Sequence, residues 1–111
     1  DLRHNTGGYF TEAIKSANLF LKKDTPLLSV IRSGSKQTNY KSSNETPFNF
    51  NIAILIDEFS ASSSEILASA LKENNAAVLI GENSYGKANS RCASGGRKKR
   101  PTRSLGEISN I

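Results

Sequence analysis

The chain has few of the residues that build covalently linked or metal-held folds. It contains one cysteine, Cys92, one histidine, His4, and neither methionine nor tryptophan. A single cysteine cannot close a disulfide within the chain, and one cysteine with one histidine is too few for a Cys/His zinc site. No apolar run approaches the roughly 20 residues of a membrane-spanning helix. We therefore expect no internal disulfide, no metal or other cofactor, and no membrane span in this piece.

The lack of methionine extends to the first position. The chain starts on Asp1-Leu2-Arg3 without a targeting segment, and we interpret it as an internal piece of a longer protein. Its 111 residues, 36% of them apolar, fit one small domain with a modest core.

The positive charge is concentrated at the carboxy-terminal end. The net charge is +5, and residues 91–111 hold six basic residues against one acidic residue, so the remaining 90 residues are balanced. This segment lacks apolar periodicity and predicts a basic, irregular, disordered tail. The run Arg97-Lys98-Lys99-Arg100 leaves open a nuclear-import or nucleic-acid patch. Because no aromatic residues interleave with it, a solvated tail is favoured and nucleic acid is not an expected partner.

The first half of the body predicts a helix and a strand pair. Residues 1–3 are typical of the end of a strand. Apolar residues at helical spacing predict a helix over residues 9–22. Residues 27–32 alternate and carry Val and Ile, and residues 38–41 are placed to pair with them across a Ser-Gly-Ser turn.

The second half predicts a βαβ unit. Residues 51–56 form a short, almost continuous apolar run, which is typical of a strand buried on both faces of a parallel sheet. A helix is expected over residues 62–72 and a second buried strand over residues 76–81. These patterns predict an α/β fold built from βαβ units, with a mostly parallel sheet, over residues 1–90.

Ser62 and Lys87 are the one pair in the chain that offers nucleophilic chemistry. Ser62 stands at a strand-to-helix junction, and Lys87 ends a glycine-bracketed turn after the next strand. A serine hydroxyl is a poor nucleophile at its free pKa, and a neutral lysine amine within hydrogen-bond reach can take its proton. The two residues are therefore candidates for a Ser-Lys dyad.

Each part of this arrangement also has a structural explanation. Ser62-x-x-Glu65 before an apolar helical pattern is a capping-box sequence, which stabilises a helix end without any catalysis. The same junction presents a hydroxyl at the carboxyl edge of a sheet, where helix N–H groups can stabilise an oxyanion. Gly7-Gly8 more often forms just a flexible turn, but consecutive backbone N–H groups free of side chains also make a concavity that binds anions.

Two other motifs point to chemistry that we do not favour. Residues 81–87 fit the G-x-x-x-x-G-K pattern of a phosphate-binding loop, but Ala88 replaces the Ser or Thr that holds magnesium, and no helical pattern follows. His4 lies in a polar context and is interpreted as a surface or turn residue. A Ser-His-Asp triad that uses it stays open, although nothing in the sequence places it near Ser62.

Three blocks of the sequence together resemble a known family. The blocks are Asp-Leu-Arg-His-Asn-Thr-Gly-Gly, Ile-Asp-Glu-Phe-Ser-Ala-Ser-Ser-Ser-Glu-Ile and Ile-Gly-Glu-Asn-Ser-Tyr-Gly-Lys. In content and order they resemble the carboxy-terminal processing, or tail-specific, serine peptidases over about residues 1–90. The resemblance implies an incomplete ClpP/crotonase-like catalytic core, and the basic tail of residues 91–111 replaces the strands that the family has further on.

The resemblance assigns roles to individual residues. The nucleophile would be Ser62 and the base Lys87. The oxyanion donors would be the backbone N–H groups of Gly7 or Gly8 and of Ser63. The remaining positions, which would support the site, are Glu65, Ser84 and Arg91.

The sequence departs from the family pattern beside both dyad residues. Ser63 stands where the family commonly has Ala, which leaves the backbone donor intact. Arg91 stands where the family has a Gln that orients the lysine, and a cation there can either keep the amine of Lys87 neutral or displace it. The unfamiliar sequence after Arg91 suggests a truncated or frame-shifted reading frame.

Two functions follow as expectations. The first is a serine endopeptidase core that cleaves unstructured carboxy-terminal regions of proteins, in the bacterial cell envelope or periplasm as the family implies. The second is an inactive piece or pseudoenzyme that keeps the fold and binds protein tails without cutting them.

Overall fold

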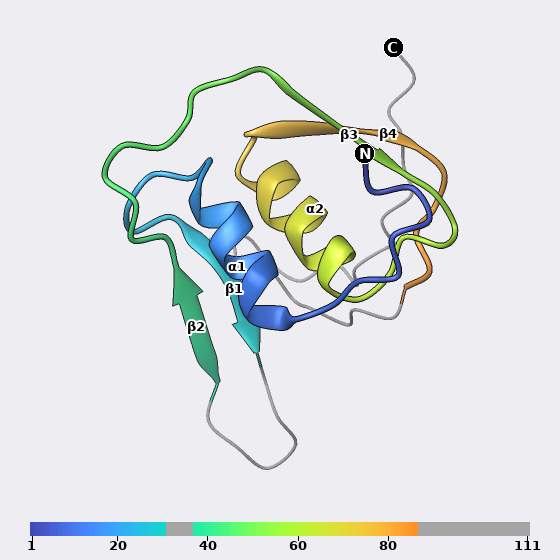
Figure 1. The fold of residues 1–111 in the computed structure, drawn as a ribbon. Coiled ribbons are helices and arrows are strands. Elements are labelled where there is room, and N and C mark those ends of the chain that lie inside the picture. Colours follow the sequence, from blue (N-terminus) through green and yellow to red (C-terminus); the bar gives the residue numbers. More distant parts are fainter. Residues whose placement is uncertain (31–36, 87–111) are drawn as a thin grey trace, which may run out of the picture.

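The computed structural model describes residues 1–30 and 37–86, which form two helices and two small sheets (Figure 1). The elements, in chain order, are α1 (Phe10–Asn18), β1 (Pro26–Val30), β2 (Thr38–Lys41), β3 (Ile52–Ile56), α2 (Ser63–Glu73) and β4 (Ala77–Gly81). The pair β1–β2 is antiparallel and the pair β3–β4 is parallel. The α/β prediction is confirmed. Residues 31–36 and 87–111, which include the expected tail, lie outside the described residues.

The β1–β2 pair forms where the alternating pattern predicted it. Its register pairs Leu28 with Tyr40 and Val30 with Thr38, and shifts between Pro26 and Leu28. Three consecutive residues, Leu27, Leu28 and Ser29, are buried, so β1 is covered on both faces and does not alternate between a buried and an exposed face.

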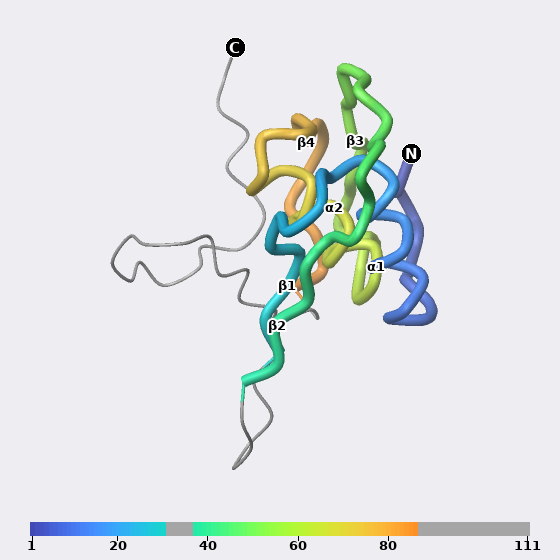
Figure 2. The backbone as a smooth tube through the Cα atoms, turned by 90° about the vertical axis from the view of Figure 1, so that its left-hand side faces the viewer, coloured from blue at the N-terminus to red at the C-terminus, as the bar shows by residue number. Residues whose placement is uncertain are grey.

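The predicted βαβ unit is present as β3, α2 and β4. The strands pair in parallel from Ile52 opposite Ala77 to Ile56 opposite Gly81. Figures 1 and 2 show α2 between β4 and α1, so this helix lies against one face of the parallel pair.

Burial of both faces of this sheet was a wrong prediction for the described residues. Ile54 and Ile56 are buried, whereas Val78 is 61% exposed and Ile80 is 45% exposed. Parallel sheets are covered by the helices of their crossovers, and the crossover from β3 to β4 supplies one helix, on one face. The apolar runs were read correctly as strands, but their second face is open in this part of the chain.

Helix α1 is shorter than its apolar pattern. It ends at Asn18, four residues before the predicted end. The side-chain oxygen of Asn18 accepts hydrogen bonds from the hydroxyl of Ser42 at 2.6 Å and the N–H of Ser43 at 2.8 Å. These contacts with a loop far along the chain turn the backbone out of the helix, and Leu21 still reaches the core at 4% exposure.

The core lies among α1, α2, β1 and β3. Small residues dominate the buried positions of the helices, with Ala17 at 1% exposure and Ala68 and Ala70 at 0%. Small side chains let helix backbones approach closely, so α1 and α2 pack against each other. The buried cluster consists of Ala17, Leu21, Leu27, Leu28, Ile54, Ile56, Ala68, Ala70 and Leu71.

The first residues are not a strand, contrary to the prediction. One backbone hydrogen bond joins the N–H of Leu2 to the carbonyl of Leu55 at 2.9 Å. Arg3 and His4 then turn the chain, and His4 has a positive φ of 59°. The turn takes the segment away from the edge of β3 before a ladder of hydrogen bonds can form.

Gly81 is the last residue of β4 and lies opposite Ile56 in the parallel pair. A substitution at this position tests the packing of the two strands. Its φ is +128°, and a Cβ added there would collide with the carbonyl oxygen of Ile56. We expect Gly81→Ala to lower the free energy of unfolding by about 2 kcal/mol or more, because strain and collision add. Urea unfolding followed by circular dichroism measures this. Gly8→Ala is the matched control, since a Cβ at Gly8 has no atom within 4 Å; equal losses in the two variants would contradict the packing.

Candidate functional site

The segment before α1 lies alongside the loop that joins β3 to α2. The N–H of Ala61 donates to the carbonyl of Asn5 at 3.0 Å, so residues more than fifty positions apart are neighbours. This pairing brings Gly7 and Gly8 to the start of α2, where Ser62 and Ser63 lie.

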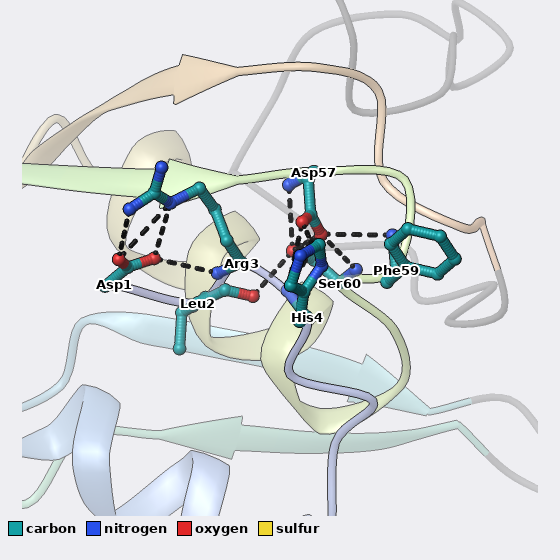
Figure 3. Close-up of polar contacts among 7 residues, drawn as sticks. All are labelled: Asp1, Leu2, Arg3, His4, Asp57, Phe59 and Ser60. Carbon is teal, nitrogen blue, oxygen red and sulfur yellow. Dashed lines mark hydrogen bonds and ion pairs between the residues drawn. The ribbon is translucent and has the colours of Figure 1, made fainter.

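Asp57 fastens the two segments together (Figure 3). Its Oδ1 accepts hydrogen bonds from the N–H groups of His4 at 3.0 Å, Phe59 at 3.1 Å and Ser60 at 3.1 Å. Its Oδ2 lies 2.6 Å from Nδ1 of His4. Burial acts to raise the pKa of Asp57, but these hydrogen bonds and the imidazole outweigh it and hold the pKa below its ordinary value.

The hydroxyl of Ser60 completes this fastening. Ser60 is fully buried. It donates to the carbonyl oxygen of Leu2 at 2.7 Å and accepts the N–H of Asp57 at 3.0 Å. The side chain therefore links the first residues of the chain to the end of β3 (Figure 3).

His4 is a turn residue with an exposed ring, as the sequence predicted. The ring also makes an edge-to-face contact with Phe59, with centroids 5.1 Å apart. The pairing of His4 with Asp57 was not predicted. The two residues are 53 positions apart, and no sequence motif indicates a contact between them. Ser60 and Asn5 were missed for the same reason.

Ser62 adopts an unusual backbone conformation. It is the N-cap of α2, with φ 57° and ψ −120°. An N-cap residue normally has extended backbone angles, and positive φ is uncommon for a residue with a side chain. Strain of this kind clusters at functional sites, which makes Ser62 a candidate functional residue.

Gly7 fits against Ser62 so closely that no side chain is possible there. Its φ is +92°, and an added Cβ would lie 2.7 Å from the oxygen of Ala61, 2.8 Å from Cβ of Ser62 and 2.9 Å from the nitrogen of Ser63. A glycine is required because real Cβ atoms do not approach so near. Close packing against residues 61–63 and the positive φ therefore explain why glycine stands at this position.

The N–H groups of the two glycines face side-chain oxygens. The N–H of Gly7 donates to Oδ1 of Asn5 at 3.0 Å, and the N–H of Gly8 donates to Oγ of Ser63 at 2.7 Å. Two of the predicted anion donors thus lie beside the predicted nucleophile, each with an acceptor from this chain.

Glu65 connects the start of α2 to the turn that precedes Lys87. Its side chain is buried, with 2% of the residue exposed. Oε2 accepts the N–H of Ser62 at 2.9 Å, as in a capping box. Oε1 accepts the hydroxyl of Ser84 at 2.7 Å and the N–H of Gly86 at 2.6 Å. One carboxylate therefore joins the two sequence blocks that carry the proposed dyad.

The structure brings together six of the eight predicted site residues: Gly7, Gly8, Ser62, Ser63, Glu65 and Ser84. Lys87 and Arg91 lie outside the described residues, so their positions stay predictions. Gly86, the residue before Lys87, has a positive φ of 81°. Its hydrogen bond to the Glu65 carboxylate holds the end of the described residues beside the start of α2.

Residues 1–30 and 37–86 contain no group of three His, Cys, Asp or Glu side chains arranged to hold a metal ion. Neither helix in those ranges is long and apolar enough to cross a bilayer.

The depressed pKa of Asp57 predicts a pH dependence of stability. A carboxyl whose folded pKa is below its unfolded value stabilises the fold above the unfolded value of about 3.9 and loses this effect as the pH falls through the folded pKa. We expect Asp57→Asn to have a lower free energy of unfolding than wild type at pH 7. This difference in free energy of unfolding should be smaller near pH 3. Urea unfolding at both pH values measures this, with the exposed Glu58→Gln as control. The same pH dependence in wild type and Asp57→Asn would contradict it.

The site occurs within a sequence that matches a known family. Residues 1–91 match the family model described as peptidase family S41. A carboxyl-terminal-processing protease of Synechocystis sp. is 38% identical over 87 residues, which cover 78% of this chain and 20% of that protein. A probable CtpA-like serine protease of Staphylococcus haemolyticus is 36% identical over 90 residues, which cover 78% of this chain and 18% of that protein.

The comparison with solved structures agrees with these sequence matches. The photosystem II D1 C-terminal processing protease superposes with a TM-score of 0.71 at 28% identity, over 78% of this chain and 22% of that one. The chain spans about a fifth of the length of these relatives. The resemblance read from the three sequence blocks is confirmed, and since the family match extends over residues 1–91, the chain belongs to peptidase family S41.

Proposed function

We propose that this chain is part of the catalytic core of a serine endopeptidase that works by a Ser-Lys dyad. The observation that carries the proposal is the buried carboxylate of Glu65, which accepts hydrogen bonds from Ser62 on one side and from Ser84 and Gly86 on the other. A carboxylate in this position sets the distance between the residue that would attack and the turn that leads to Lys87. The strained backbone of Ser62 and the family match support the same assignment.

The reaction would be acyl transfer. The neutral amine of Lys87 takes the proton of the Ser62 hydroxyl as Oγ attacks the carbonyl carbon of the scissile peptide. The negative charge that develops on the carbonyl oxygen is stabilised by the backbone N–H groups of Ser63 and of Gly8 or Gly7. The C–N bond breaks, the leaving amine takes the proton from Lys87, and water then hydrolyses the acyl-serine with Lys87 again as base.

The substrate class proposed is the unstructured carboxy-terminal region of other proteins. It follows from the names of the relatives, which process carboxyl termini, and from the exposed position of Gly8 beside α2, where an extended chain has access. A location in the bacterial cell envelope or periplasm, the ClpP/crotonase-like form of the core and an orienting role for Arg91 belong to the same proposal.

A second candidate is a form that binds protein tails without cutting them. The specific observation in its favour is that Asn5 and Ser63 occupy the N–H groups of Gly7 and Gly8, the groups that would hold the oxyanion. Binding of an unstructured peptide without cleavage, unchanged by Ser62→Ala, would favour this candidate.

The nucleophile has a direct test. We expect Ser62→Ala to reduce cleavage of an unstructured peptide with a free carboxy-terminus by a factor of 10³ or more, on the order seen when a catalytic nucleophile is removed. Mass spectrometry of the products measures the rate. Ser69→Ala is the control, because it removes a hydroxyl from the same helix away from the site. Cleavage that persists in Ser62→Ala would contradict the mechanism.

The base makes a prediction about pH. A lysine amine has an ordinary pKa of about 10.4 and accepts a proton only when neutral, so cleavage should increase from neutral to alkaline pH. Lys87→Arg keeps the positive charge but cannot be neutral at these pH values, and we expect it to be inactive throughout. Initial rates between pH 6 and pH 10 measure this. A flat profile would count against Lys87 as the base.

A further inference from the structure

Ser63 makes a contact that the proposed mechanism does not use. Its side chain lies in the first turn of α2, and its Oγ accepts the N–H of Gly8 at 2.7 Å. This is at the short end of the range for hydrogen bonds from backbone N–H groups. The N–H that would hold the oxyanion therefore already has a partner within the chain, next to the nucleophile.

We propose that the Ser63 hydroxyl competes with the substrate carbonyl for the Gly8 amide and so sets the resting state of the site. The inference rests on the proposed function, in which Gly8 is an oxyanion donor. A backbone N–H carries one hydrogen, so it cannot serve both acceptors at full strength. Ser63 must turn to another rotamer before Gly8 can stabilise the transition state.

The direction of the effect follows from what else holds the glycine segment. The carbonyl of Asn5 accepts the N–H of Ala61 at 3.0 Å, and Gly7 is enclosed by Ala61, Ser62 and Ser63. These contacts do not involve the Ser63 hydroxyl. Its removal should therefore leave the segment in place and free the Gly8 amide, so that the rate rises.

Rotation of a serine side chain is fast, so the competition lowers the rate without blocking it. The cost is that of one neutral hydrogen bond, which corresponds to about two- to tenfold in rate. Because the competition concerns the transition state more than the bound substrate, it should appear in kcat with little change in KM.

The test compares Ser63→Ala with Ser63→Thr in the full chain. Alanine removes the hydroxyl and is a good helix former, whereas threonine keeps the hydroxyl. We expect kcat on the unstructured peptide to be about two- to tenfold higher in Ser63→Ala than in Ser63→Thr, which keeps the competing hydroxyl. The amide proton of Gly8, observed by NMR, should move upfield in Ser63→Ala alone, which reports the lost hydrogen bond independently of activity.

The outcomes separate this inference from the proposed function. Cleavage that depends on Ser62 but does not rise in Ser63→Ala would overturn the competition and leave the peptidase assignment intact. An unchanged Gly8 amide signal would overturn it as well. If neither wild type nor Ser63→Ala cleaves, although the Gly8 signal moves, the proposed function fails and the competition fails with it.

Discussion

The buried carboxylate of Glu65 is the interaction on which the rest of the site depends. Taking a carboxylate out of water is costly unless hydrogen bonds compensate for the lost hydration. Here Ser62, Ser84 and Gly86 supply donors from two segments about twenty residues apart. Neither segment can move without leaving part of the charge uncompensated, so the start of α2 and the turn after β4 form one unit.

A second constraint adds the amino-terminal segment to this unit. Gly7 fits against Ala61 and Ser62 only because it has no side chain, and Asp57 binds the backbone and ring of His4 from the other side. The site therefore consists of three stretches of chain that local sequence does not hold together. Backbone and carboxylate contacts hold these three stretches in place, and the apolar core supports helix α2.

One face of the parallel pair β3–β4 is exposed in the described part of the chain. Helix α2 covers the face that carries Ile54 and Ile56, and Val78 and Ile80 remain exposed on the strand beside them. The chain spans about a fifth of the length of its relatives. The site residues do not depend on that open face, since their contacts are with the loops at the carboxyl ends of β3 and β4.

The sequence by itself determined most of the elements, the family and which residues are candidates for the site. Apolar patterns predicted both helices and three of the strands, because they reflect burial along a regular backbone. Pairing across a turn predicted the fourth strand, and three motif blocks indicated the family. Tertiary structure decided where α1 stops, that the first residues turn away from β3, and that His4 meets Asp57. It also placed the hydroxyl of Ser63 on the amide of Gly8. Contacts between residues more than twenty positions apart decide these features, and no local pattern records such contacts.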